Sequence, residues 1–359
     1  MAKAKIHRRI LVSPLNWGLG HATRLIPIIE ELILQGHYVL LAGDGSSLAI
    51  LRDAFPQLDW QTLPGFNVSL SRRRSQCLQL LLQVPAFLSS IKKEHTAVKN
   101  VINQYAIDLI ISDNRYGLYS KHVASVIITH QTNPYPGKYL VWMRPFTKRL
   151  STRLLKHFDE CWLPDSESKP KLSGTLSSPS KGLITKYLGY LSRINTNIKT
   201  NRSSAPDILV ILSGPEPQRT LLETILIKQL KGSGLKTTML CAQPERDKEQ
   251  IENITLLPHC SPDEYYKLIM NSEHIICRSG YSTLMDLMVC QKTALLIPTP
   301  GQYEQEYLAK RASKLFGFST ISQNHLKSKE ITHFLSTCSK TMKTVTPVKF
   351  KLPLLPPKK

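Results

Sequence analysis

Residues 274–312 have the sequence HIICRSGYSTLMDLMVCQKTALLIPTPGQYEQEYLAKRA, and this stretch decides the fold. The apolar run HIIC ends at Arg278-Ser279-Gly280, where a helical pattern begins, and a second apolar run, ALLI, follows that pattern. Short apolar runs separated by helices are typical of parallel strands that are buried on both faces of a sheet. We therefore expect a strand, a helix and a second parallel strand here.

The same alternation runs through most of the chain, in two blocks. The first block contains RRILVSPL, HYVLLAGD, AIDLIISDN, ASVIITHQ and ECWLPD, and the second contains DILVILSG, KTTMLCA and NITLLPH. This order predicts an α/β protein with two Rossmann-like domains facing across a cleft, where ligands of open α/β sheets bind. The predicted boundaries are 1–190 for the N-terminal domain, 191–205 for a linker, 206–325 for the C-terminal domain, and 326–359 for a C-terminal helix and a weakly structured Pro/Lys-rich tail.

Composition limits the partners and the compartment. The chain has 359 residues, with 47 Lys and Arg against 26 Asp and Glu, a formal net charge of +21. Such an excess favours an anionic partner: nucleic acid, an acidic membrane surface or a phosphorylated substrate. The seven scattered cysteines form no C-x-x-C pair, which is typical of reduced thiols in a cytosolic protein. No run approaches the ~20 apolar residues of a membrane-spanning helix.

The loop GLGH, residues 18–21, lies between the first strand and the first helix. Gly18 and Gly20 allow either a tight turn or a close approach by a ligand, and Thr23 stands where the dinucleotide fingerprint has its third glycine. His21 falls at the helix start, whose positive dipole end disfavours imidazolium, so it is either a neutral base or a helix-capping residue. The sequence leaves these alternatives open.

Two charged residues follow another predicted strand, in IISDNRYG. Asp113 could act as the catalytic base, could orient His21, or could simply be a turn residue. Arg115 lies two positions further along and is a candidate for substrate binding.

The helix that begins after Gly280 is a candidate diphosphate site. Free backbone N–H groups at a helix N-terminus, together with the hydroxyls of Ser282 and Thr283, suit an anion. Asp286 follows three positions after Thr283, either as part of a capping-box-like pair or as a ligand of a ribose diol.

Two further loops have similar positions. In ILSGPEP, Ser213 and Gly214 follow a strand and permit close approach by an anion. In PGQYEQEY, Gln305 and Glu306 fall at a helix start that we expect at the same edge of the second sheet.

These motifs resemble the donor-binding half of the two-Rossmann-domain (GT-B) glycosyltransferases, and specifically the N-acetylglucosaminyltransferase family that forms lipid II. The resemblance implies that the R-S-G turn, Arg278 to Gly280, holds the diphosphate of a sugar nucleotide. It also implies that Asp286, in place of the usual Glu, binds ribose, and that Gln305-Glu306, in place of Gln-Gln, binds the sugar. Ser213 and Gly214 are the matched positions in a loop that otherwise departs from the family pattern.

The N-terminal half carries the same resemblance, in GLGHATR and IITHQTN. It implies that His21 is the base that activates the acceptor, and that His130 and Asn133 lie near the acceptor. With Gly18, Gly20 and Arg115 they form the predicted acceptor site. The resemblance covers most of residues 9–318 and is dense in 16–27 and 274–312.

A basic and leucine-rich segment, SLSRRRSQCLQLLLQVPAFLSSIKK, occupies residues 69–93. Arg72, Arg73 and Arg74 beside apolar residues suit an anionic membrane surface or a lipid-linked acceptor. A core helix with solvated basic ends explains the pattern equally well.

The sequence thus predicts a metal-independent glycosyltransferase without a cofactor. It would move a sugar, such as N-acetylglucosamine, from a UDP-sugar to the hydroxyl of a lipid-linked acceptor in cell-envelope synthesis. We expect it to be cytoplasmic and peripheral on the inner face of the membrane. One alternative is a nucleotide-sugar hydrolase or epimerase of the same fold, because Arg24 completes the G-x-G-H-x-x-R pattern that some of these hydrolases share. The other is a basic nucleic-acid-binding protein, suggested by charge alone and without a recognisable module.

Overall fold

The structure is a computed structural model, and its first residues are not among those it describes. The described residues are 7–66, 83–178, 182–196, 198–199, 205–214, 216–243, 245–337, 342 and 348–359. Arg72, Arg73 and Arg74 therefore lie outside the described residues, and the membrane role predicted for them stays a prediction. The chain divides into two compact units: the first comprises the described residues up to Ser192 together with Lys349–Lys359, and the second is Arg193–Val348.

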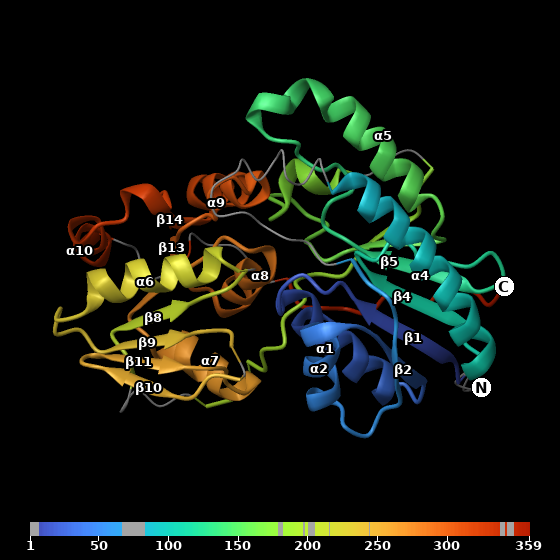
Figure 1. The fold of residues 1–359 in the computed structure, drawn as a ribbon, viewed down its shortest axis with the longest axis horizontal. Coiled ribbons are helices and arrows are strands. Elements are labelled where there is room, and N and C mark those ends of the chain that lie inside the picture. Colours follow the sequence, from blue (N-terminus) through green and yellow to red (C-terminus); the bar gives the residue numbers. More distant parts are fainter. Residues whose placement is uncertain are drawn as a thin grey trace. The chain divides into compact units, whose positions relative to one another are not determined.

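The first unit contains a parallel sheet of seven strands in the order β3-β2-β1-β4-β5-β6-β7 (Figure 1). Its strands are β1 (Arg9–Pro14), β2 (Tyr38–Gly43), β3 (Trp60–Thr62), β4 (Leu109–Asp113), β5 (Ala124–Ile128), β6 (Glu160–Leu163) and β7 (Thr185–Tyr187). Its helices are α1 (Gly20–Leu34), α2 (Gly45–Ala54), α4 (Val84–Tyr105) and α5 (Arg144–Leu155), with the 3₁₀ turns η1 (Lys138–Met143) and η2 (Gly174–Ser177).

The second unit repeats this plan with the order β10-β11-β9-β8-β12-β13-β14, in which only the β10–β11 pair is antiparallel among the described strands. Its strands are β8 (Ile208–Ile211), β9 (Thr237–Leu240), β10 (Glu249–Ile251), β11 (Ile254–Leu257), β12 (His274–Cys277), β13 (Leu295–Leu296) and β14 (Ser319–Thr320). Its helices are α6 (Gln218–Leu230), α7 (Pro262–Asn271), α8 (Tyr281–Cys290), α9 (Tyr303–Phe316) and α10 (Ser328–Thr337), with the 3₁₀ turn η3 (Gln323–His325).

The predicted fold class, two Rossmann-like α/β domains, is confirmed. Every residue of β4, β5, β6, β8 and β12 is buried, as continuous apolar strands covered on both faces require. In α1 the buried residues recur at helical spacing, and the helix is followed by Gly36 at φ +78°, a left-handed conformation that favours glycine. The short edge strands β3, β10 and β14 were not predicted, because strands of two or three residues give little periodic signal in the sequence.

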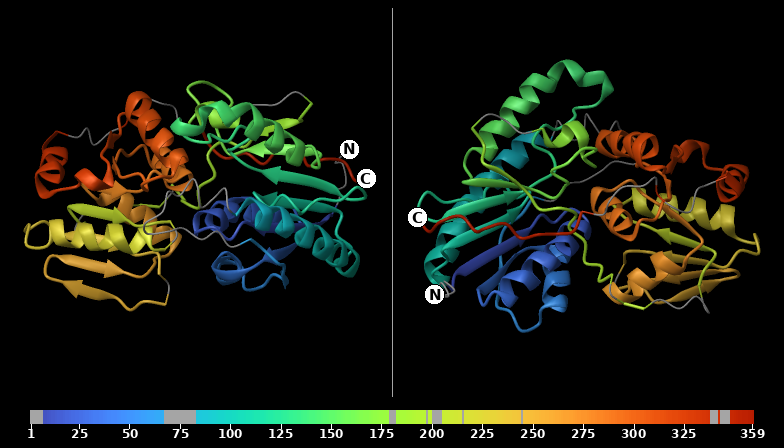
Figure 2. Two further views of the ribbon diagram at one scale, coloured as in Figure 1. Left: turned by 45° about the horizontal axis from the view of Figure 1, so that its top comes forward. Right: turned by 180° about the vertical axis from the view of Figure 1, so that it is seen from behind.

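The C-terminal stretch belongs to the first unit, although we had expected it as a weakly structured tail after the second domain. The backbone N–H of Lys351 donates to the Leu188 carbonyl, and Lys359 Nζ lies 2.8 Å from Asp159 Oδ2. Figure 2 shows this stretch in red, running across the first unit until the C-terminus lies close to the N-terminal end of the described chain. The stretch has no helix or strand, so charged side chains and backbone hydrogen bonds hold it in place.

Candidate active site

The crevice of the first sheet lies between β1 and β4. The chain leaves β1 for β2 on one side, and it returns through α4 to β4 on the other side. Loops that diverge in this way open a space beyond the carboxyl ends of the two strands, where α/β proteins bind ligands. Pro14 at the end of β1 pairs with Asp113 at the end of β4, so the start of α1 and Asp113 meet at this point.

Asp113 forms a buried cluster with two residues of α1. Arg24 donates to both carboxylate oxygens, with its Nε 2.6 Å from Oδ2, and His21 Nδ1 lies 3.2 Å from Oδ2. Asp113 and Arg24 are almost completely buried, whereas the His21 side chain keeps some exposure. His21 and Arg24 are one helical turn apart, so α1 presents both to the same carboxylate.

The charges of this cluster fix its protonation. Burial alone would raise the pKa of Asp113, but the adjacent charges of Arg24 and His21 outweigh burial and lower it to about 2. Burial lowers the pKa of His21 below its usual 6.5, and the Arg24 charge lowers it further, against an opposing effect of Asp113. Asp113 is therefore ionised and His21 neutral near pH 7. We assign the His21 proton to Nδ1, facing Asp113, which leaves the Nε2 lone pair able to accept a proton.

His130 lies close to this cluster, and Asn133 is hydrogen-bonded to the η2 turn. His130 is buried just beyond β5, near enough for its charge to contribute to the lowered pKa of His21. Asn133 donates from Nδ2 to the Thr175 carbonyl and holds the η2 turn, while its buried Oδ1 has no hydrogen-bond partner in the described chain. Gly18 has φ +74°, and no atom lies within 4 Å of the place where a side chain would begin. Gly20 is the first residue of α1.

The geometry does not support the acceptor-binding role expected for Arg115. Its guanidinium is buried, with Nε 3.0 Å from Glu94 Oε1 and Nη1 3.3 Å from Asp44 Oδ1, and Nη2 donates to the Pro64 carbonyl. Because these partners lie inside the first unit and occupy its donors, Arg115 ties α4 and the β2–α2 turn to the sheet instead of facing a ligand. Sequence reasoning missed this network, since its members are far apart in the chain.

The second unit brings the loops after β8, β12 and β13 to one edge of its sheet. β12 pairs in parallel with β8 on one side and with β13 on the other. Arg278 connects all three loops: its Nη2 donates to the Gln218 carbonyl at 2.8 Å, and its Nη1 donates to the carbonyls of Ile297 and Pro298 at 3.1 and 3.2 Å.

Arg278 therefore holds the loops around the expected diphosphate site in place. It is completely buried, and no ion pair involves it in the described chain, so burial lowers its pKa to about 9. Its Nε has no hydrogen-bond partner there either. Ser279 is also buried, and its hydroxyl donates to the Gln305 carbonyl at 2.8 Å. Both residues position loops, which differs from the direct ligand contact that we expected.

The start of α8 remains open to a ligand. Gly280 is its N-cap, with an ordinary φ of −68°, and the nearest atom to an added Cβ would be Thr283 Oγ1 at 4.0 Å. Gly214, at the end of the β8 loop, has φ +96° and also has nothing within 4 Å of that position. Ser282 and Thr283 lie in the first turn of α8, and Ser213 is half-buried in the loop after β8.

Asp286 is half-buried one turn further along α8. It lies near Tyr265 of α7, because its charge, second to burial, raises the pKa of that phenol. The Arg193 guanidinium lies 4.9 Å from the centre of the Tyr265 ring. Asp286 thus faces the α7 side of α8, within the same unit as Gly280.

Gln305 and Glu306 differ from each other in their surroundings. The Gln305 amide accepts from the Thr299 N–H at 2.9 Å and donates to Gln302 Oε1 at 2.6 Å, so it closes the loop before α9. Glu306 lines an open pocket of about 450 Å³ beyond β13 and β14. Its other lining residues include Pro298, Gly301, Lys310 and Thr320.

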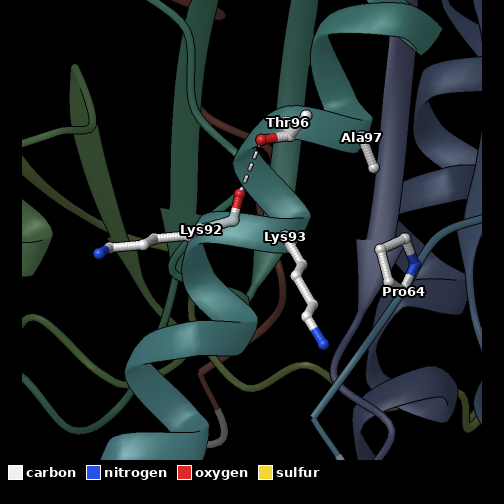
Figure 3. Close-up of a pocket in the computed structure, with 5 residues that line it drawn as sticks. All are labelled: Pro64, Lys92, Lys93, Thr96 and Ala97. Carbon is white, nitrogen blue, oxygen red and sulfur yellow. Dashed lines mark hydrogen bonds between the residues drawn. The ribbon is translucent and has the colours of Figure 1, made fainter.

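A further pocket of about 470 Å³ lies on the first unit (Figure 3). Pro64 and one side of α4 line it, with Lys92, Lys93, Thr96 and Ala97. It holds no carboxylate, histidine or thiol that could catalyse a reaction, so we do not assign it to the active site.

The described residues contain neither a metal-binding cluster nor a membrane-spanning helix. No group of three His, Cys, Asp or Glu side chains there is arranged to hold a metal ion. No helix there has the length and apolar character needed to cross a membrane. The predicted lack of a metal and of a cofactor stays a prediction.

Comparisons with known proteins agree with this architecture. Residues 215–348 match the glycosyltransferase family 28 C-terminal domain. An uncharacterized glycosyltransferase of Methanosarcina mazei is 22% identical over 325 residues, which cover 83% of this chain and 81% of the relative. The UDP-N-acetylglucosamine--N-acetylmuramyl-(pentapeptide) pyrophosphoryl-undecaprenol N-acetylglucosamine transferase of Haemophilus ducreyi is 20% identical over 294 residues, 80% of this chain and 78% of that protein.

Solved structures show the same fold. The spinosyn rhamnosyltransferase SpnG aligns with a TM-score of 0.63 at 13% identity, over 92% of each chain. MurG of Acinetobacter baumannii aligns with a TM-score of 0.55 at 13% identity, over 92% of this chain and 90% of that one. These structures show that the chain has the GT-B fold. The family 28 match and the curated relatives show that it is an enzyme, a glycosyltransferase. Its second unit carries the C-terminal domain of glycosyltransferase family 28.

Proposed function

We propose that this glycosyltransferase moves N-acetylglucosamine from its uridine diphosphate donor to a hydroxyl of a lipid-linked acceptor, with His21 as the base. The observation that carries the proposal is the buried cluster in which ionised Asp113 holds a neutral His21. A neutral imidazole of fixed orientation is what an acceptor hydroxyl needs to lose its proton.

In the proposed reaction the acceptor oxygen forms a bond to the anomeric carbon of the sugar. Its proton passes to His21 Nε2, and the resulting imidazolium is stabilised by Asp113. The bond between the anomeric carbon and the diphosphate breaks, and the diphosphate leaves with the electron pair. The N–H groups and dipole at the start of α8 stabilise the charge that develops on it, without a metal in our proposal.

The donor half of the proposal is supported by Gly280. Neither its backbone conformation nor its surroundings require glycine in the ligand-free protein. A glycine at a helix N-terminus with open space beside it fits the close approach of a diphosphate. The structure of SpnG complexed with thymidine diphosphate shows that a relative in fold binds a nucleoside diphosphate.

The identity of the sugar and the acceptor is supported by the relatives' names. The Haemophilus ducreyi relative transfers N-acetylglucosamine to an undecaprenol-linked acceptor, as its name states. On this basis we propose a role in cell-envelope glycan synthesis, in the cytoplasm at the inner face of the membrane. Glu306 marks a departure from the Gln-Gln pair of that family, so the sugar is the first point to test.

The deciding experiment measures release of uridine diphosphate and formation of glycoside with a panel of UDP-sugars, with and without a polyprenyl-diphosphate-linked sugar acceptor. We expect release to depend on the acceptor and to be fastest with UDP-N-acetylglucosamine. Free sugar formed at the same rate without an acceptor would instead identify a hydrolase. An epimerised sugar nucleotide would identify an epimerase.

The Gly280→Ala substitution tests the diphosphate site. The new methyl group meets no atom closer than 4.0 Å, so the free energy of unfolding should stay within about 0.5 kcal/mol of the parent. Affinity for uridine diphosphate should fall by about 1–3 kcal/mol, the usual cost of overpacking a filled space. Calorimetry gives the affinity, and urea unfolding gives the stability.

Gly234→Ala is the matched control, because it lies outside the candidate site, nothing lies within 4 Å of an added side chain there, and φ +74° strains any side chain. Its affinity for uridine diphosphate should equal that of the parent. We expect this variant to lose about 1 kcal/mol of stability even without nucleotide. Unchanged nucleotide affinity in a stable Gly280→Ala variant would show that the diphosphate does not bind at the start of α8.

The Asp286→Ala substitution tests the ribose contact. It should weaken binding of uridine diphosphate by about 1–3 kcal/mol, as expected for loss of a charged hydrogen-bond partner. Calorimetry should show the effect for uridine diphosphate, whereas inorganic diphosphate should bind equally well to both proteins. Asp263→Ala, an exposed carboxylate in the first turn of α7, is the control. Equal losses in the two variants would contradict a specific role for Asp286.

A further inference from the structure

The buried guanidinium of Arg115 lies where the loops after four strands meet. Arg115 itself follows β4, and its Nη1 donates to Ser13 Oγ on β1 and to Asp44 Oδ1 after β2, both at 3.3 Å. Its Nη2 donates to the Pro64 carbonyl after β3. Because β3, β2, β1 and β4 are neighbours in the sheet, this one side chain connects the loops on both sides of the crevice between β1 and β4.

The Asp44 carboxylate carries these contacts toward α1. Asp44 is the N-cap of α2, a position at which aspartate ordinarily accepts hydrogen bonds from the N–H groups of its own helix. It makes no such bond here. Its Oδ1 accepts from Arg115, and its Oδ2 accepts from Asn16 Nδ2 at 3.4 Å. The carboxylate therefore holds the loop before α1 and does not cap α2.

Two serines of α2 hold the same loop. Ser46 Oγ donates to Asn16 Oδ1 at 3.3 Å, and Ser47 Oγ donates to the Leu15 carbonyl at 3.2 Å. The start of α1 has no side-chain hydrogen bond at its own N-cap, so these contacts from α2 are what anchors the approach to it. His21 is the second residue of α1 and follows directly from this loop.

The turn that carries Asp113 is fixed by the same side chains. Ser112 Oγ donates to the Arg115 carbonyl at 2.7 Å. Glu94 of α4 accepts from Arg115 Nε and from the Gly117 N–H, both at 3.0 Å. The residues on both sides of Asp113 are thus tied to the network that also reaches Asn16.

We propose that Asp44 and Arg115 are positioning residues for His21, acting through Asn16 and through the turn after β4. Neither touches the reacting atoms. They hold the imidazole and the Asp113 carboxylate at their 3.2 Å separation before the acceptor binds. Such positioning matters because a misplacement of about 1 Å can cost about 10²-fold in rate. The catalytic consequence rests on the proposed function of His21 as the base; the positioning itself does not.

The test exchanges the donor and the acceptor of the Asn16–Asp44 hydrogen bond. In Asn16→Asp two carboxylates face each other, and in Asp44→Asn an amide nitrogen replaces one of the two accepting oxygens. In the double variant the amide at position 44 donates to the carboxylate at position 16, while its oxygen still accepts from Arg115. We expect each single variant to lower kcat about 10–100-fold with unchanged affinity for uridine diphosphate, and the double variant to recover most of the loss.

The protonation of His21 gives a readout that a loss of stability alone would not change. Burial is the largest cause of the lowered pKa of His21, and the other groups that act on it are Arg24, Asp113 and His130. A loosened loop exposes the imidazole, so the acid limb of kcat should move up toward pH 6.5 in each single variant and return in the double variant. Diethyl pyrocarbonate reacts with neutral imidazole, so the pH dependence of His21 modification, followed by mass spectrometry, reports the same pKa without a substrate.

Asp59→Asn is the control, because this exposed carboxylate accepts from the Tyr38 hydroxyl at 2.7 Å and lies just before β3, at the opposite edge of the sheet. It should leave kcat and both pH midpoints as in the parent. The proposal is overturned if the single variants keep the kcat and midpoints of the parent, or if the double variant shows the summed losses of both. If His21→Ala keeps full activity, the proposed base is wrong, and the modification midpoint then decides alone: an unchanged midpoint in the single variants overturns the positioning role, and a raised one supports it.

Discussion

His21→Ala is expected to lower kcat by about 10²–10⁴-fold, the usual contribution of a general base, while the affinity for uridine diphosphate stays the same. We expect kcat to change without the nucleotide affinity, because His21 belongs to the first unit and the candidate nucleotide loops belong to the second. Steady-state kinetics with the acceptor, together with calorimetry of nucleotide binding, measures the two quantities separately.

The pH profile gives this prediction a second readout. Burial and the Arg24 charge lower the pKa of His21 below 6.5, so the residue stays neutral, and active as a base, down to a pH below that value. We expect the acid limb of kcat to have its midpoint below pH 6.5. The same shift makes the folded state lose stability as pH falls below 6.5, because the unfolded chain then binds the proton more readily.

His122→Ala, at an exposed histidine of the first unit, is the control and should leave kcat unchanged. If an Asp113→Ala protein that circular dichroism shows to be folded has no activity while the His21 variant keeps it, Asp113 is the base and His21 is only its neighbour. An unaltered acid limb in His21→Gln would lead to the same conclusion.

Asp113→Asn is expected to lower the free energy of unfolding by about 3–5 kcal/mol. The substitution keeps the size of the side chain but leaves the buried Arg24 guanidinium without its counter-charge, and an uncompensated buried charge costs about that much. Arg24→Gln on the same background removes the stranded charge, so the double variant should recover part of the loss. Urea unfolding of the four proteins in this cycle measures the coupling.

The effect of Asp113→Asn should depend on pH in a defined direction. The pKa of Asp113 is about 2 in the folded protein against a usual value of 3.8, so its contribution is present above pH 4 and is lost as pH falls from about 4 to about 2. The difference between parent and variant should therefore shrink across that window. Asp53→Asn, at an exposed carboxylate of α2, should change stability by no more than about 0.5 kcal/mol at any of these pH values. A full-sized difference that persists at the acid end would contradict the ion pair.

The apolar pattern alone predicted the α/β class, most strands, and the order in which helices interrupt them. Those features follow from local regularities, because a strand covered on both faces must be apolar throughout and a helix must repeat its buried residues about every 3.6 positions. The pattern also placed His21 at a helix start and Asp113 after a strand, so each became a candidate before any partner was known.

Only the tertiary structure showed which side chains pair with each other. Arg24 lies 89 positions from Asp113 along the chain, and they meet because β1 and β4 are neighbours in the sheet. The order of the strands also explains Arg115, whose guanidinium pairs with Glu94 and Asp44 and does not face a ligand. The strand order also brings Arg278 within hydrogen-bond distance of the carbonyls of Gln218 and Ile297, so that it holds these loops together.

The tertiary structure also decided which side chains are exposed to solvent. Trp142 and Phe146 are large apolar residues, yet they are exposed. The C-terminal stretch, predicted as a weakly structured tail, belongs to the first unit. The sequence by itself determined the class of the fold and the chemical nature of the candidate groups. The tertiary structure decided which groups meet, which are buried and which face solvent, because these depend on strand order and on contacts between residues that no local pattern connects.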